Sequence, residues 1–161
     1  MGATSGPDPD PERALAEVGA ELADQVASTV PPWVVRCVAT VFDAWRDAQT
    51  TRAPVLGEAE AAGRRAGEAL RADLRRLLAA DVDAQWATPL ELVRRAVAFP
   101  TEVLRAAGVP PVERDRFTAE RFPDDDYGLT PASLATVDPS LAEPSVRWGA
   151  AKAAAHRRRH T

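Results

Sequence analysis

The chain lacks most of the residues from which metal and redox sites are built. It has 161 residues but a single cysteine, Cys37, and two histidines, His156 and His160. One cysteine excludes an internal disulfide and a cysteine-rich zinc site. The Glu-x-x-His pair that ferritin-like di-iron sites require on two helices does not occur. We therefore expect no metal ion or other cofactor, and we interpret Cys37, within the apolar run 33–42, as a small buried thiol.

Aromatic residues and long apolar runs are also scarce. Aromatic side chains make up 6 % of the chain, so we expect a core of Leu, Val and Ala between closely packed helices. No apolar run approaches the ~20 residues that a membrane-spanning helix needs. The N-terminal sequence does not combine the basic and apolar regions of a secretory signal. These absences predict a soluble, cytoplasmic protein that makes no contact with a membrane.

The glycine-rich motifs of nucleotide-binding and hydrolytic enzymes are missing as well. The chain contains no G-x-x-x-x-G-K, no G-x-G-x-x-G and no G-x-S-x-G. Ser-His-Asp chemistry would have to use a histidine at the C-terminal end of the chain as its base. The net charge of −4 is too mild and of the wrong sign for nucleic-acid binding by the whole surface. The sequence therefore favours a protein that is not an enzyme, and nucleic acid is not the expected partner.

What the chain does contain is alanine-rich sequence with the apolar spacing of amphipathic helices. We predict four main helices, over residues 10–28, 32–50, 54–80 and 88–108. Pro31 and Pro32 should separate the first two helices, and Pro100 should bend the fourth near residues 98–100. Short connections favour antiparallel neighbours. The predicted fold is therefore all-α, an antiparallel helical bundle interrupted by one long proline-rich irregular segment.

The two ends of the chain complete the predicted organisation. Residues 1–9 can bury nothing and should form a disordered lead. After an interruption at Pro144, a short C-terminal helix over 145–158 should lie across the bundle, with Val146, Trp148 and Ala151 toward the core. Residues 156–161 form a basic tail. We thus expect a single helical domain over residues 10–155.

Two local motifs predict particular features of these helices. Thr88-Pro89-Leu90-Glu91 is typical of a helix start, because Thr88 can accept a first-turn N–H and Pro89 stands where no N–H is needed. Gly108 supplies a natural stop. Gly63 and Gly67 lie four residues apart within one predicted helix. Each glycine lowers helix stability by up to ~1 kcal/mol, so we expect close packing of a second helix to offset that cost.

The irregular segment, residues 109–131, differs from everything around it. Its sequence, VPPVERDRFTAERFPDDDYGLTP, is rich in proline, acidic and aromatic residues. A stretch of about twenty irregular residues in a compact domain is usually functional or disordered, and aromatic residues argue against disorder. We therefore predict an adaptor or regulatory protein that binds another protein, or a second copy of itself, through this segment. The expected contact residues are Phe117, Arg121, Phe122, Asp124, Asp125, Asp126 and Tyr127.

The helix expected over 54–80 carries a second charged surface. Its arginines form a basic face that suits a phosphate or an acidic partner, namely Arg64, Arg71, Arg75 and Arg76. The acidic residues of 113–127 are one such partner, within one molecule or between two. Two alternatives stay open at this point. One is a nucleic-acid-associated protein that uses this face and the basic tail. The other is an enzyme whose site lies near Asp124–Tyr127 and uses an arginine from 71–76.

Overall fold

The structure is a computed structural model that describes residues 10–48, 56–78 and 88–161, and these residues form helices and no strand. The predictions for residues 1–9, for the breaks at 50–54 and 81–87 and for the ends of the 54–80 helix lie outside the described residues. The long helices are α1 (Pro11–Ala48), α2 (Leu56–Leu78) and α7 (Ala142–Arg159). Between α2 and α7 the chain forms α3 (Pro89–Arg95), α4 (Ala98–Ala106), α5 (Arg116–Arg121), α6 (Leu134–Val137) and a 3-10 turn, η1 (Pro139–Leu141).

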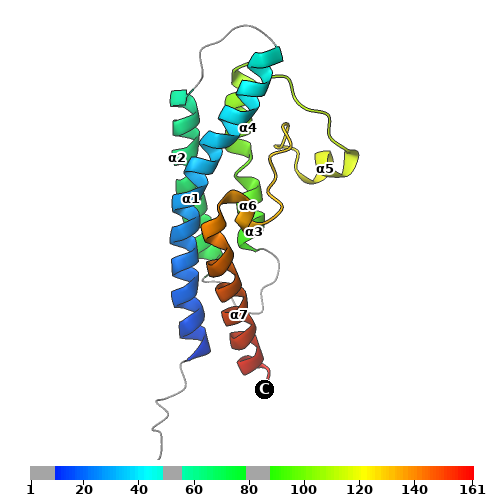
Figure 1. The fold of residues 1–161 in the computed structure, drawn as a ribbon. Helices are drawn as coiled ribbons and strands as arrows, with labels where there is room; N and C mark the ends of the chain where they lie inside the picture. Colours follow the sequence, from blue (N-terminus) through cyan, green and yellow to red (C-terminus); the bar gives the residue numbers. More distant parts are fainter. Residues whose placement is uncertain (1–9, 49–55, 79–87) are drawn as a thin grey trace, which may run out of the picture.

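The helices pack as a bundle with α1 at its centre. α1 contacts α2, α4, α6, η1 and α7, and Figure 1 shows α2 and α7 running alongside it in the opposite direction. The shared core is aliphatic, as predicted, and its fully buried side chains include Leu22, Val26, Leu74 and Leu104. These findings confirm the predicted all-α class and the packing of the helices as a bundle. No helix among the described residues is long and apolar enough to cross a membrane.

The first two predicted helices are one helix, so the expected boundary at Pro31-Pro32 is wrong. α1 continues through both prolines, and Figure 1 shows it bending about its middle. Pro31 and Pro32 cannot donate to the carbonyls one turn earlier, which costs about 3 kcal/mol for each proline in a helix interior. The helix persists because side chains before and after the prolines are buried in one core, and each contributes about 1.5–3 kcal/mol. They include Leu22, Val26, Val30, Trp33, Val34 and Val38.

The prolines of α1 pack directly on the two glycines of α2. A methyl group added at Gly63 would lie 2.8 Å from the Pro31 carbonyl oxygen, and one at Gly67 would lie 2.9 Å from Pro31 Cγ. Both glycines are buried. The pair therefore makes the close helix–helix contact that the sequence predicted, and this contact is centred on the proline that was expected to end the helix.

The helix predicted over 88–108 starts and stops where expected. Thr88 caps α3, because its hydroxyl oxygen accepts a hydrogen bond from the Glu91 N–H at 3.3 Å. After α4 the chain leaves the helix at Gly108, whose φ of 79° is the left-handed conformation that glycine adopts most easily. The next residue, Val109, donates its N–H to the Leu104 carbonyl at 3.0 Å. The capping residues Thr88 and Gly108 were therefore enough to predict where this helical stretch begins and ends.

The break within this stretch lies just before the predicted position. α3 ends at Arg95 and α4 begins at Ala98, so the interruption falls at Ala96–Val97 rather than at 98–100. The carbonyl of Ala96 stands four residues before Pro100, where the proline ring clashes and no N–H is available. Phe99 N–H bonds to that carbonyl instead, at 3.2 Å. Pro100 therefore breaks its helix by the expected mechanism.

The C-terminal helix begins earlier than predicted and runs along α1, not across the bundle. α7 starts at Ala142, so Pro144 lies in its first turn, where a missing N–H does not break the helix. Trp148 is half-buried against the core, but Val146 is 72 % exposed, which contradicts its predicted burial. The basic residues His156–Arg159 belong to the last turn of α7.

Replacing Gly63 by alanine tests the contact between α1 and α2. The new methyl group meets the Pro31 backbone, which cannot move without disturbing α1, so we expect a loss of about 1–3 kcal/mol in the free energy of unfolding. Gly149→Ala in α7 is the matched control, because nothing lies within 4 Å of its added methyl group. The control should gain up to about 1 kcal/mol from helix propensity. Urea unfolding followed by circular dichroism measures both, and equal stabilities would contradict the packing described here.

Candidate protein-interaction surface

The segment 109–131 is a loop that is closed at its base by its own side chains and backbone. The Tyr127 hydroxyl donates a hydrogen bond to the Val109 carbonyl at 2.8 Å, and Val112 N–H donates to the Asp126 carbonyl at 3.0 Å. The Tyr127 side chain is buried, and this burial raises the pKa of its phenol. These contacts join residues 14 and 18 positions apart, so they hold the part of the segment between them as a projection from the bundle.

Asp125 organises the turn that follows. Its carboxylate is fully buried and accepts hydrogen bonds from Leu129 N–H at 2.6 Å, from Thr130 N–H at 2.9 Å and from the Thr130 hydroxyl. Gly128 makes this turn possible with a φ of 67°. Burying a carboxylate is costly unless hydrogen-bond donors satisfy its oxygens, and here all three donors are needed for that. Asp125 therefore holds the loop together and does not face a partner.

Asp126 ties the segment to the bundle. It forms ion pairs with Arg105 of α4 and with Arg114, whose Nη2 lies 3.5 Å from Asp126 Oδ1. The hydrogen bond from Arg105 holds the pKa of Asp126 below that of a free aspartate. A lowered pKa in the folded state means that this contact stabilises the protein at neutral pH. The stabilisation is lost as the pH falls through that lowered pKa.

A short helix that the sequence did not predict lies in the middle of the segment. Asp115 caps α5, because its carboxylate accepts hydrogen bonds from the Thr118 N–H at 2.8 Å and from the Thr118 hydroxyl at 3.0 Å. These bonds lower the pKa of Asp115. Figure 1 shows α5 standing out from the bundle, on the other side of α1 from α2. At this position Phe117 leaves 69 % of its surface exposed.

Arginine and phenylalanine side chains alternate across the junction of α3 and α5. The Arg121 guanidinium carbon lies 5.9 Å from the centre of the Phe117 ring and 5.4 Å from that of Phe122, and Arg94 lies 5.9 Å from Phe122. Glu91 links the two guanidinium groups, at 2.8 Å from Arg94 and 3.4 Å from Arg121. We call these five residues the Arg–Phe surface. Sequence reasoning found Phe117, Arg121 and Phe122 but missed Glu91 and Arg94.

A small pocket adjoins the Arg–Phe surface. It has a volume of about 100 Å³ and is lined by Arg94, Arg95, Val97, Arg121, Phe122, Pro123 and Asp124. Asp124 is exposed, unlike its neighbours Asp125 and Asp126. The three consecutive aspartates thus have three different environments. Among the predicted contact residues, Phe117, Arg121, Phe122 and Asp124 can meet a partner, whereas Asp125, Asp126 and Tyr127 support the segment.

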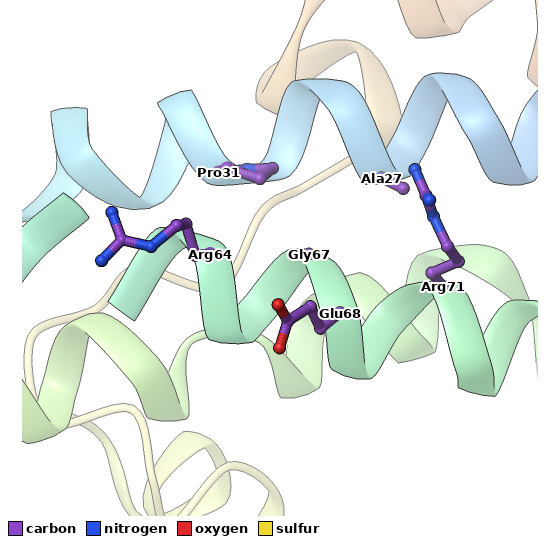
Figure 2. A pocket seen from close by; sticks show the side chains of 6 residues that line it. All are labelled: Ala27, Pro31, Arg64, Gly67, Glu68 and Arg71. Carbon is purple, nitrogen blue, oxygen red and sulfur yellow. The ribbon is translucent and has the colours of Figure 1, made fainter. Parts of the chain in front are cut away.

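The arginines of α2 do not form one site. Arg64 and Arg71 flank a pocket of about 260 Å³, and Figure 2 shows Glu68 between them and Arg71 reaching toward α1 beside Ala27. The pocket is a consequence of helix packing, because Gly67 has no side chain and Pro31 leaves the Ala27 carbonyl without its helical donor. Two further arginines lie beyond it, exposed Arg75 and Arg76, and Arg76 is paired with Asp73.

Docking of the acidic segment on this basic face within one molecule, one of the possibilities considered above, is not seen among the described residues. In the described ranges, no ion pair joins an acid of 113–127 to an arginine of α2. The expected enzymatic arrangement is not assembled either, because the arginines beside Asp124 come from α3 and α5 rather than from 71–76. Burial raises the pKa of the half-buried Cys37 thiol to about 12, which leaves it protonated and unreactive at neutral pH.

The basic C-terminal residues are engaged with the start of α1. Arg158 lies 3.4 Å from Asp10, and Arg159 lies 2.9 Å from Glu12. His156 and His160 place their rings 4.5 Å apart, but the described residues contain no group of three side chains that could hold a metal ion. The end of α7 is therefore connected to the start of α1, because two of its arginines form ion pairs there.

Asp125→Asn tests the difference between the buried and the exposed aspartates. The amide turns an N–H₂ group toward donors that need an acceptor, so we expect a loss of at least about 2 kcal/mol in stability. We also expect faster hydrogen exchange at the Leu129 and Thr130 amides. Asp124→Asn is the matched control, because its side chain is exposed and forms no hydrogen bond with the described part of the chain. If both variants unfold at the same urea concentration, Asp125 does not have the supporting role assigned to it.

Comparison of the chain with protein-family models, with curated proteins and with solved structures gave no significant match. No family is therefore assigned to this protein. Its function has to be inferred from the Arg–Phe surface, the pockets and the charges described above.

Proposed function

We propose that this protein binds another protein through the Arg–Phe surface and acts as an adaptor or regulatory partner rather than as an enzyme. The observation that carries the proposal is Phe117, a large apolar side chain that is 69 % exposed at the tip of a fixed projection. Aromatic and arginine side chains contribute most of the binding energy at protein interfaces. Here both kinds of side chain are stacked on one another before any partner arrives.

The contacts at the base of the segment support this proposal. Tyr127, Asp125 and Asp126 fix the loop from within, and Glu91 connects the guanidinium groups of α3 and α5. A surface that is ordered before binding loses less conformational entropy when the complex forms. The internal contacts thus have a function of their own, because they present Phe117 without requiring the partner to order the segment.

The other two functions considered above have less support. Arg158 and Arg159 already have acidic partners, Asp10 and Glu12 at the start of α1, which the phosphates of a nucleic acid would have to displace. The pocket beside the Arg–Phe surface, at about 100 Å³, is smaller than the roughly 300–1,000 Å³ of pockets that enclose a small-molecule substrate. A projecting surface with one exposed aromatic anchor suits a protein partner better than either ligand.

The test is a pull-down from a lysate of the source organism with three tagged full-length baits: the unchanged protein, Phe117→Ser and Val146→Ser. Val146 is a matched control, because it is 72 % exposed but lies on α7, away from the segment. We expect at least one protein to be retained by the unchanged and Val146→Ser baits and lost with Phe117→Ser. Mass spectrometry identifies it, and circular dichroism verifies that all baits are folded.

Other outcomes of this pull-down contradict the proposal. If Phe117→Ser retains every protein that the other baits retain, the Arg–Phe surface is not the binding site. A high 260/280 nm absorbance ratio in all eluates would instead indicate nucleic acid. If the protein lost with Phe117→Ser is the untagged chain itself, the partner is a second copy.

A further inference from the structure

The pocket beside the Arg–Phe surface collects three guanidinium groups within a small space. Arg94 and Arg95 come from α3, and Arg121 comes from the end of α5. Two of them are held in place by Glu91, and Arg94 also donates from Nε to the Pro131 carbonyl at 3.4 Å. The Arg95 guanidinium forms no hydrogen bond or ion pair with any residue that the structure describes, and the side chain is exposed.

These guanidinium groups keep hydrogen-bond donors for a ligand. Each guanidinium has five N–H donors. Glu91 accepts from Nη1 of Arg94 and from Nη2 of Arg121, which leaves donors on both groups besides all those of Arg95. Among the described residues, Asp124 supplies the one carboxylate that lines the pocket. Three positive charges against Asp124 and the neighbouring Glu91 leave an excess of one, and this excess favours a singly charged anion.

We propose that this pocket binds a carboxylate side chain of an acidic segment of the partner protein, with Arg95 as its main ligand. This inference rests on the proposed function, because it names the chemistry of the partner that meets the Arg–Phe surface. A carboxylate matches the planar fork of a guanidinium with two parallel hydrogen bonds. The apolar lining suits the methylene stem of a glutamate or an aspartate, and it consists of Val97, Phe122 and Pro123.

Two features of the pocket select a carboxylate over a phosphate group. Its volume of about 100 Å³ accepts the end of one side chain and not a nucleotide or another cofactor. A singly charged carboxylate would bring the net charge of the three arginines, Asp124 and Glu91 to zero, whereas a doubly charged phosphate would leave the pocket with a net negative charge. Asp124 lowers the positive charge of the pocket, so removing its charge should tighten binding of the carboxylate.

The experiment is an NMR titration of the full-length protein with a probe of known structure. The probe is a blocked tri-glutamate peptide, and the blocked tri-glutamine peptide is its uncharged control. We expect saturable shifts of the Nε–Hε signals of Arg94, Arg95 and Arg121 with the first peptide and none with the second. Arg95→Ala should weaken binding about fivefold or more, and Asp124→Asn should strengthen it about two- to fivefold.

Arg75→Ala is the matched control for the loss of one positive charge. Arg75 is also exposed and has no partner among the described residues, but it lies on α2, away from the pocket. Its removal should leave the affinity unchanged. The inference is overturned if Arg95→Ala and Arg75→Ala weaken binding equally, or if all exposed arginines shift together without saturation. An unchanged affinity of Asp124→Asn would also contradict it.

The same variants separate this inference from the proposed function. If Phe117→Ser loses a partner while Arg95→Ala retains it and the acidic peptide does not saturate, the carboxylate site is wrong and the proposed function stands. If the acidic peptide binds through Arg95 but no protein depends on Phe117, the anion site exists without the proposed function. Loss of the same partner with both variants supports both.

Discussion

The contact of Pro31 with Gly63 and Gly67 is the interaction on which the bundle depends. It lets α1 and α2 approach until a single added methyl group would collide with backbone atoms. At this distance the apolar stripes of both helices are buried, and that burial offsets the two missing backbone hydrogen bonds of α1. Because α1 remains continuous, one helix provides the surface on which α2, α4 and α7 all pack.

A second constraint acts at the opposite side of the molecule. The segment 109–131 carries polar and aromatic groups that would ordinarily belong to a mobile loop, yet Tyr127, Asp125 and Asp126 turn inward and close it. The segment therefore combines a buried base with an exposed tip. This division explains how Phe117 stays exposed to water while contacts at the base of the segment hold the backbone around it.

Prolines show most clearly where local rules apply and where they fail. Pro100 interrupts its helix by the clash and the missing donor that the sequence predicted. Pro31 and Pro32 have the same chemistry, but α1 continues through them. The glycines of α2 leave room for Pro31 to pack closely against them, and side chains from both halves of α1 are buried in one core. The difference lies in the neighbouring helix. For this reason, no inspection of residues 28–32 alone distinguishes the two cases.

By itself, the sequence determined the all-α class, the cap at Thr88, the stop at Gly108 and the close contact of the paired glycines, because spacing, capping and composition are local properties of the chain. It also identified the segment that carries three of the five residues of the Arg–Phe surface, Phe117, Arg121 and Phe122. The tertiary structure decided which acids face inward and which arginines meet Phe122. Those outcomes depend on pairs far apart in the chain, such as Glu91 with Arg121 and Val109 with Tyr127, whose proximity only packing creates.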